Sequence, residues 1–415
     1  MREEQASIPL GAAAASPVHY KWVVLGVLTL AHLVTSNSAL SIQPLAPFLQ
    51  QDLDLRNVQI GLMTSAFYLG ALVFSVPLGW FVDRFGVLWV LVGSQVVVGT
   101  FILAVSNAHS FAMILLFLVL GGIGYSGINP SSGKAIMCWF PWKGRATAMS
   151  IKQTGIPLGG ALAAATLPAL AQAFSWRAAF IVTGAVTVAA AIVSALFYKE
   201  PRGAGSPHDP ATFLYRDWRR MLEIFHNRDL VLLNVLVVAF LALQMVLMTY
   251  LVLFFHDVLA RSVLVAGFFL SVAHVGGVAG RLTWGLVSDY VMSGRRRPVL
   301  MLNGGISALM CFSCSFLSPG HPSWLLFIVV FVFGFSAIGW NGLYLTYVGE
   351  LSGKDQTGAA TGASLTIIYV GVLIGPPLFG FAIDRTGSYA LSWRIAAAVM
   401  AVATMLIPIV KEKKG

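Results

Sequence analysis

Residues 58–86 read VQIGLMTSAFYLGALVFSVPLGWFVDRFG, and this stretch decides the architecture of the chain. It contains no Asp, Glu, Lys or Arg before Asp83 and Arg84. Because a helix needs about 20 apolar residues to cross the hydrocarbon core of a bilayer, residues 58–82 are predicted to form a transmembrane helix. The charged pair and Gly86 mark the point where the chain leaves the membrane.

The rest of the chain repeats this apolar pattern. Of its 415 residues, 58% are hydrophobic and only 10% are charged, whereas about 25% are charged in a soluble domain. Continuous apolar runs without two-residue alternation predict helices rather than a membrane barrel. We therefore predict an all-α polytopic membrane protein, which excludes a soluble enzyme, a disordered chain and a disulfide scaffold. Its twelve predicted spans, numbered 1 to 12, cover residues 22–47, 58–82, 88–107, 111–137, 146–170, 177–198, 229–254, 262–288, 299–318, 324–348, 357–381 and 391–410.

The distribution of basic residues predicts the orientation. With the N-terminus inside, 18 of the 26 Lys and Arg residues lie in cytoplasmic segments and only 5 lie outside. Basic residues accumulate on the cytoplasmic side of membrane proteins. Both termini are therefore predicted to be cytoplasmic, in a plasma or inner membrane, and the net charge of +10 reflects topology rather than binding of nucleic acid.

Three motifs occur twice, in the same order, which predicts a duplicated six-helix unit. The copies are shifted by 206, 212 and 216 residues. Transporters often contain such repeats. The predicted divisions are an N-terminal bundle over 1–198, a cytoplasmic central loop over 199–228 and a C-terminal bundle over 229–415. The motif pairs are Gly79-x-x-x-Asp83 with Gly285-x-x-x-Asp289, Gly127-x-Asn129 with Gly339-x-Asn341, and Gly155-x-x-x-Gly159 with Gly371-x-x-x-Gly375.

The repeated glycines and acids have a physical role. Small residues four positions apart allow helix backbones to approach closely in lipid. An Asp at the end of span 2 or span 8 can pair with Arg or cap a neighbouring helix. Such contacts predict a latch between the moving halves, formed by Gly79, Asp83, Arg84, Gly86, Gly285 and Asp289.

With these motifs the chain resembles the major facilitator superfamily over essentially its whole length. The superfamily motif G-x-L-a-D-R-x-G-R-K is matched at Gly79, Asp83, Arg84 and Gly86, whereas Val87 and Leu88 replace its basic pair. The resemblance implies two six-helix bundles that rock around a central cavity. The span 4 arginine of the drug–proton antiporters is absent, since residues 118–122 read LVLGG.

The charges inside the spans are all positive. Each of the 16 acids lies in a loop or near a helix end, whereas Lys134, Lys152 and Arg281 lie within spans. Charges within a bilayer are costly and usually functional. Lys134 is expected to reach the inner interface, and Lys152 is a candidate anion contact. A core with cations and no acid predicts an anionic substrate.

Arg281 is the leading candidate for the substrate contact. It lies on a largely small or polar face of span 8 that includes Gly267, Ser271 and His274, and its planar fork suits a carboxylate. The alternative is that Arg281 reaches the cytoplasmic interface or pairs with a helix end. Residues 280–287, GRLTWGLV, also resemble span 8 of monocarboxylate transporters and oxalate/formate antiporters. That resemblance implies that Arg281 binds a carboxylate.

Two histidines and several polar residues complete the predicted site. His32 and His274 lie near mid-depth and are candidates for proton coupling, because histidine titrates near neutral pH; the alternative is a neutral, hydrogen-bonded role. The remaining candidates are at depths that suit substrate contact, with interhelical packing as the alternative. They are Asn37, Tyr125, Asn129, Lys152, Asn341, Tyr344 and Tyr369.

We predict a secondary transporter for a small organic anion, most simply a monocarboxylate, that works by alternating access with proton symport. No phosphate-binding loop of the form G-x-x-x-x-G-K-[ST] occurs, so ATP is not expected to drive transport. Neither an enzymatic constellation, a cofactor nor a metal site is predicted. The alternatives are a proton-coupled exporter of drugs or other hydrophobic compounds, an organic or inorganic anion exchanger, and a non-transporting sensor.

Overall fold

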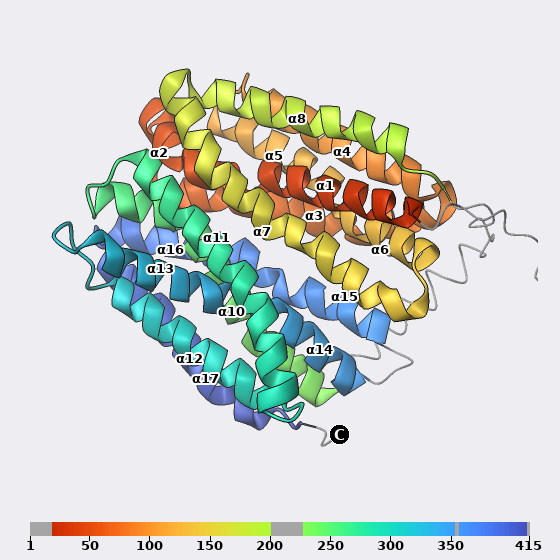
Figure 1. Ribbon diagram of the computed structural model, residues 1–415. Helices are drawn as coiled ribbons and strands as arrows, with labels where there is room; N and C mark the ends of the chain where they lie inside the picture. The colour runs from red at the N-terminus through yellow and green to blue at the C-terminus, as the bar shows by residue number, and fades with distance from the viewer. Residues whose placement is uncertain (1–18, 201–226, 353–356, 413–415) are drawn as a thin grey trace, which may run out of the picture.

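The computed structural model describes residues 19–200, 227–352 and 357–412, and the described part is helical (Figure 1). Most of the predicted central loop lies outside these residues. The N-terminal half contains α1 (Tyr20–Ala39), α2 (Ile42–Leu53), α3 (Asn57–Phe85), α4 (Val87–Val105), α5 (Phe111–Ser126), α6 (Ile128–Trp139), α7 (Trp142–Ala173) and α8 (Trp176–Phe197).

The C-terminal half contains α10 (Arg228–Asp257), α11 (Val263–Leu286) with a π-helical turn over Val287–Val291, α12 (Arg296–Cys314), α13 (Ser323–Ala337), α14 (Asn341–Ser352), α15 (Thr357–Ile368), α16 (Val370–Thr386) and α17 (Tyr389–Leu406) with a 3-10 turn over Ile407–Ile409. We call the end that holds Tyr20, Phe197, Arg228 and Ile409 the inner end. The opposite end, with Leu53, Asn57, Thr386 and Tyr389, is the outer end.

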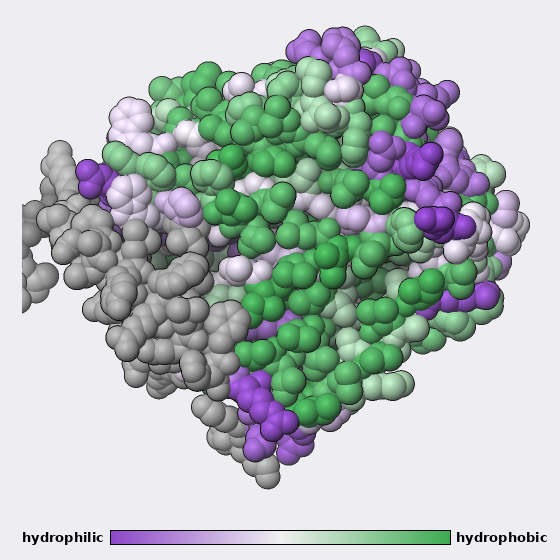
Figure 2. All heavy atoms as spheres, turned by 180° about the vertical axis from the view of Figure 1, so that it is seen from behind, coloured by the Kyte–Doolittle hydropathy of each residue, from purple (hydrophilic) through white to green (hydrophobic). Residues whose placement is uncertain are grey.

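The helices confirm the prediction of a polytopic all-α membrane protein. Eleven described segments are long and apolar enough to cross a membrane. The remaining predicted span, span 9 over residues 299–318, corresponds to α12, which has 19 residues but begins with Arg296 and Arg297 and includes Asn303. Figure 2 shows apolar side chains over the face behind that of Figure 1, with hydrophilic groups gathered toward the two ends. Such a surface suits contact with lipid tails.

Four spans are broken near their middle. The breaks separate α1 from α2, α5 from α6, α13 from α14 and α15 from α16. The duplicated Gly-x-Asn motif lies at two of them, with Asn129 near the start of α6 and Asn341 at the start of α14. Non-helical backbone at membrane depth is tolerated where protein or water covers it. The repeat therefore places polar residues at equivalent mid-membrane breaks in the two halves.

The duplicated Gly-x-x-x-Gly motif lies at equivalent helix contacts, as the packing argument predicts. A Cβ at Gly159 would lie 2.3 Å from Leu33 O of α1, and a Cβ at Gly371 would lie 2.3 Å from Val238 O of α10. In each half the fifth span thus packs its glycines on the backbone of the first span. Any larger residue at these positions would push the two helices apart.

The two halves meet toward the outer end. α3 packs on α16, α7 packs on α11, and α2 packs on α10. At the outer ends of α3 and α16, the backbone N–H groups of Asn57 and Val58 donate to the carboxylate of Asp384 over 3.1 and 2.9 Å. Nearer the centre, Ser65 Oγ donates to Val372 O and Leu373 O. Every hydrogen bond found between the halves within the described residues lies in this outer part or near the centre, so the structure is closed toward the outer end.

Candidate substrate site

A group of three tyrosines and one arginine lies where the halves meet at mid-depth. Tyr68 comes from α3, Tyr125 from the end of α5 and Tyr369 from the break before α16. The ring centroid of Tyr68 is 6.3 Å from that of Tyr125 and 6.2 Å from that of Tyr369. Arg281 of α11 is close enough to Tyr125 for its charge to act on the phenol. Both halves therefore contribute to this group, which we call the tyrosine–arginine site.

The polar atoms of this site are largely without protein partners. Among the described residues, the guanidinium of Arg281 makes one hydrogen bond, from Nε to Ile338 O at 3.4 Å, and no ion pair. Ile338 lies at the break between α13 and α14, so Arg281 points toward the middle of span 10 rather than the inner surface. The hydroxyls of Tyr68 and Tyr369 have no hydrogen-bond partner in the described part of the chain, yet they are not fully enclosed. An unpaired cation and free hydroxyls at mid-depth are suited to a polar anion.

His32 and Lys152, which were predicted separately, share one hydroxyl group. Lys152 Nζ donates to Ser132 Oγ over 2.8 Å, and His32 Nε2 lies 2.9 Å from the same oxygen. Ser132 in turn donates to Ile128 O. All three side chains are at most 2% exposed. Lys152 is thus enclosed within the N-terminal half in this conformation rather than open to a ligand.

His274 lies in the closed contact between the halves. Its ring packs on Gly160 of α7, where a Cβ would be only 2.4 Å from His274 Cε1. The side chain is fully buried, and neither ring nitrogen has a hydrogen-bond partner within the described residues. A buried imidazole without partners is costly when charged. This position therefore requires a neutral His274 while the outer end is closed.

The amide candidates occupy different surroundings. Asn37 Nδ2 donates to Gly159 O over 3.3 Å, so Asn37 joins span 1 to span 5. Asn341 Nδ2 donates to Gln244 Oε1 over 3.2 Å and to Ile338 O, beside the hydrogen bond from Arg281. Asn129 is exposed at the start of α6. Of the three, Asn341 is directly linked to the tyrosine–arginine site.

Tyr344 lies away from that site, inside the C-terminal half. Its hydroxyl donates to Asn234 Oδ1 over 2.8 Å, and Asn234 Nδ2 donates to Ser364 Oγ over 2.9 Å. The side chain is fully buried. In this conformation these contacts favour interhelical packing, the alternative interpretation of Tyr344.

Replacing Tyr344 with Phe should therefore affect stability and not substrate recognition. Loss of one buried hydrogen bond costs about 1 kcal/mol, and the orphaned Asn234 oxygen adds to this. We expect a lower melting temperature of the purified protein and an unchanged KM for uptake. A tenfold higher KM with an unchanged melting temperature would instead show that Tyr344 contributes to substrate binding.

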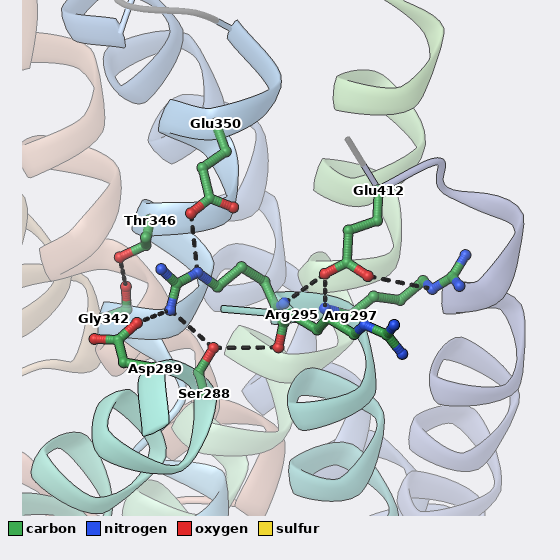
Figure 3. A network of polar contacts seen from close by, with 9 residues as sticks. Ser288, Asp289, Arg295, Arg297, Gly342, Thr346, Glu350 and Glu412 are labelled. Atoms are coloured by element: carbon green, nitrogen blue, oxygen red, sulfur yellow. Dashed lines mark hydrogen bonds and ion pairs between the residues drawn. The ribbon is translucent and has the colours of Figure 1, made fainter. Parts of the chain in front are cut away.

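The predicted latch residues form contacts within each half at the inner end. Asp83 pairs with Lys134 over 2.9 Å, and Arg84 stacks against Trp80. In the C-terminal half, Arg296 joins Asp289 and Glu350. Figure 3 shows this network, in which Glu412 accepts from the backbone at Arg297 and Ser288 donates to the backbone at Arg295. In the described residues neither acid of the duplicated motif contacts the other half.

Gly79 and Gly285 have open space around them, since a Cβ at either would meet nothing within 4 Å. A latch formed by these two glycines requires another helix to pack closely on them. In this conformation no described residue does so. Gly86 differs, because Glu200 caps the helix that follows it through the N–H groups of Val87 and Leu88. The latch therefore stays a prediction for the opposite conformation.

Sequence reasoning missed Tyr68, Ser132 and the pair formed by Asn57 and Asp384. For Asp384 a signal exists: residues 380–387 read GFAIDRTG and repeat the G-x-x-x-D-R-x-G pattern of residues 79–86. This copy lies at the outer end of α16, opposite to the copy at the inner end of α3. For Tyr68 and Ser132, nothing in the sequence separates them from other polar residues of apolar helices.

Removing the carboxylate of Asp384 should weaken the outer closure. Asp384→Ala leaves the first N–H groups of α3 without their acceptor, which costs about 1 kcal/mol for a capping contact. We expect several-fold faster labelling of a cysteine introduced at Ser65 by a membrane-impermeant thiol reagent, in a background with Cys138 replaced by Ser. Unchanged labelling would show that Asp384 contributes nothing to the closure.

The family model identifies the class, which is that of secondary transporters. Residues 28–376 and 293–411 match the model of the Major Facilitator Superfamily, and the chain belongs to this superfamily.

Curated relatives align along almost the full length. The "Hexuronate transporter" of Bacillus subtilis (strain 168) is 26% identical over 409 residues, covering 91% of this chain and 92% of that protein. The "Probable sulfoacetate transporter SauU" of Cupriavidus necator is 26% identical, with 92% of each chain covered. The "Probable galactarate/D-glucarate transporter GudP" of Bacillus subtilis (strain 168) is 24% identical, with 98% and 95% covered.

Solved structures confirm the fold. A bacterial homolog of the human lysosomal transporter Spinster, in an inward-facing and occupied conformation, superposes with a TM-score of 0.78 at 19% identity, covering 94% of this chain and 97% of that one. The nucleoside transporter NupG superposes with a TM-score of 0.79 at 14% identity, covering 95% and 100%. At these identities the likeness establishes the architecture alone.

Proposed function

We propose that the protein transports a small organic anion, with Arg281 as the contact for its carboxylate. The observation that supports this is the guanidinium of Arg281, which lies at mid-depth with one carbonyl contact and no acid paired to it among the described residues. A buried cation needs a counter-charge. A substrate carboxylate provides it in bidentate form.

The simplest substrate is a monocarboxylate, because the site offers one guanidinium, which has no acid paired to it within the described ranges. The names of the relatives fit the anion class: a hexuronate has one carboxylate, galactarate and glucarate have two, and sulfoacetate has a carboxylate and a sulfonate. We therefore place this chain among organic-anion transporters of the plasma membrane, with both termini cytoplasmic. The 1–198 and 229–415 halves are the units that move.

Alternating access is the proposed mechanism. In this conformation α3 with α16, and α7 with α11, close the outer end, and the latch acids pair within their own halves. Breaking the outer contacts while forming new ones at the inner end would turn the tyrosine–arginine site to the other side. Such rocking of two repeats about a central site is general for this architecture.

Proton symport is the proposed coupling, with His32 and His274 as the proton carriers. Each has a ring nitrogen without a partner in the described part of the chain. His274 lies at the contact between the halves, beside Gly160, whereas His32 lies beside Lys152 within the N-terminal half. If they carry the proton, replacing both with Gln should abolish accumulation driven by a pH gradient while exchange of substrate across the membrane continues. Unchanged gradient-driven accumulation in the double variant would reject this role.

The function is tested with purified protein in proteoliposomes loaded with D-glucuronate, D-glucarate, sulfoacetate, lactate or phosphate. We expect counterflow of at least one organic anion and its loss in Arg281→Ala. Counterflow of none of them, combined with resistance of expressing cells to hydrophobic cations, would favour the exporter alternative. A phosphate signal that exceeds those of all organic anions would favour an inorganic anion exchanger.

A further inference from the structure

We propose that Tyr68, Tyr125 and Tyr369 select hydroxylated carboxylates, the class of the sugar acids, over unhydroxylated acids of similar size. The proposal rests on the proposed function, because it assigns the part of the substrate that extends beyond the carboxylate at Arg281. The phenol groups bind the hydroxyls of the substrate, and the aromatic rings contact its C–H face.

The rings form a surface that bridges the two halves. Tyr68 and Tyr369 are nearly parallel, with an interplanar angle of 29°, and Tyr125 stands at 82° to Tyr68. Phe67 lies 5.5 Å from Tyr125 and supports it from within the N-terminal half. Aromatic faces and edges of this kind offer apolar contact area with little loss of side-chain freedom, together with a polar tip on each ring.

The hydroxyl groups of the three tyrosines are incompletely satisfied by the residues that the structure describes. Tyr68 and Tyr125 are only 7% and 8% exposed, and Tyr369 is half-buried. Buried tyrosine hydroxyls normally find a hydrogen-bond partner. Those of Tyr250 and Tyr344 do so in this protein, whereas those of Tyr198 and Tyr347 have none among the described residues. The hydroxyls of Tyr68 and Tyr369 have none in the described residues, and Tyr125 has only Ser36 beside it. Within the described residues, three adjacent tyrosines with incompletely satisfied hydroxyls, one of them near the guanidinium of Arg281, match a ligand with one carboxylate and several hydroxyls.

The same hydroxyls disfavour an apolar acid. A ligand whose carbon chain lacks hydroxyls would cover the phenol groups and leave them unpaired, which costs binding free energy. Sites built to bond a substrate hydroxyl reject analogues without it far more strongly than apolar pockets discriminate by size. Selectivity for hydroxylated acids therefore follows from the tyrosine–arginine site without any further charged residue.

The position of Tyr369 adds a second consequence. Tyr68 and Tyr125 belong to the N-terminal half, whereas Tyr369 and Arg281 belong to the C-terminal half. A ligand held by the carboxylate at Arg281 and by hydroxyls at Tyr68 or Tyr125 touches both halves at once. An acid without hydroxyls is held strongly by only one half, so it should also be translocated less well than its binding predicts.

The test compares D-glucuronate with hexanoate, two six-carbon monocarboxylates that differ in hydroxylation. Binding to the purified full-length protein is measured by isothermal titration, and uptake by competition in proteoliposomes. We expect D-glucuronate to bind at least about 100-fold more tightly. Tyr68→Phe and Tyr369→Phe should each lower that ratio about tenfold by weakening D-glucuronate alone. Tyr344→Phe removes a fully buried hydroxyl that bonds Asn234 within the C-terminal half, away from the tyrosine–arginine site, and should leave the ratio unchanged.

The outcomes separate this inference from the function on which it rests. If neither acid binds and none of the organic anions shows counterflow, the proposed function fails. If organic anions are transported but hexanoate or sulfoacetate equals D-glucuronate, the selection by hydroxyls is wrong and the anion function stands. An unchanged ratio in both Phe variants of the site would also overturn the role of these tyrosines, because Phe retains the ring and removes only the hydroxyl.

Discussion

Arg281→Ala is expected to abolish substrate uptake while the protein inserts into the membrane at the wild-type level. Truncating one partner of a buried, hydrogen-bonded charge pair costs about 2–5 kcal/mol. This corresponds to a loss of affinity between roughly 30-fold and several-thousand-fold. Counterflow of a transported organic anion in proteoliposomes measures the loss directly.

Failed insertion cannot explain that loss. An arginine near the centre of a membrane helix makes insertion less favourable by about 2.5–3.5 kcal/mol, so its removal favours insertion. Arg281 makes one hydrogen bond to the described residues, to Ile338 O at 3.4 Å, and because this bond is long, little native structure depends on it. Expression and melting temperature of the variant should therefore equal or exceed those of the wild type.

Arg394→Ala is a matched control, because it removes the same charge at the outer end of α17, where Arg394 contacts Ser315. It should leave counterflow unchanged. Arg281→Lys retains the charge and loses the planar fork, so an intermediate affinity is expected. Wild-type uptake by Arg281→Ala would remove the anion contact from the proposed function.

The sequence predicts the spans of this protein well because their signal is local. Hydropathy locates each helix to within a few residues, and the glycine pairs at Gly155 and Gly371 predict backbone contact correctly. Arg281 is conspicuous for the same reason: a cation in an apolar run needs an explanation whatever the fold. These features depend on residues close together in the chain.

Features that depend on which helices meet could not be predicted. The sequence makes Lys152 a candidate ligand contact, but it does not indicate that Lys152 donates a hydrogen bond to Ser132 on another span. Tyr344 reads as a cavity residue until Asn234 is placed beside it. The sequence correctly places Asp384 near a helix end. It does not indicate that the carboxylate binds the first turn of α3, which lies more than 300 positions earlier in the chain. Pairing at such separation is set by tertiary packing alone.

The close contact between α3 and α16 leaves no space for a side chain at Gly61. A Cβ at this position would lie 2.5 Å from the carbonyl carbon of Pro376 and 2.7 Å from the nitrogen of Pro377. These are backbone atoms and cannot rotate away. Gly61→Leu therefore prevents α3 and α16 from reaching their present separation, and the outer end cannot close.

We expect Gly61→Leu to fold, because the open outer end is a conformation that alternating access must visit, but to transport at less than about 1% of the wild-type rate. The expected loss follows from overpacking, whose cost of about 1–3 kcal/mol or more falls on the closed state alone. A cysteine at Ser65, which the closure covers through Val372 and Leu373, should become reactive from the outer side.

Gly26→Leu controls for the added bulk, since a Cβ at Gly26 meets nothing within 4 Å. It should transport normally and leave the cysteine at position 65 protected. The two glycines lie in helices of the same half and differ in what they face, so a difference between the variants isolates the contact with Pro376. If Gly61→Leu transports as well as Gly26→Leu, closure of the outer end does not require the present approach of α3 to α16, and another pair of helices must form the outer gate.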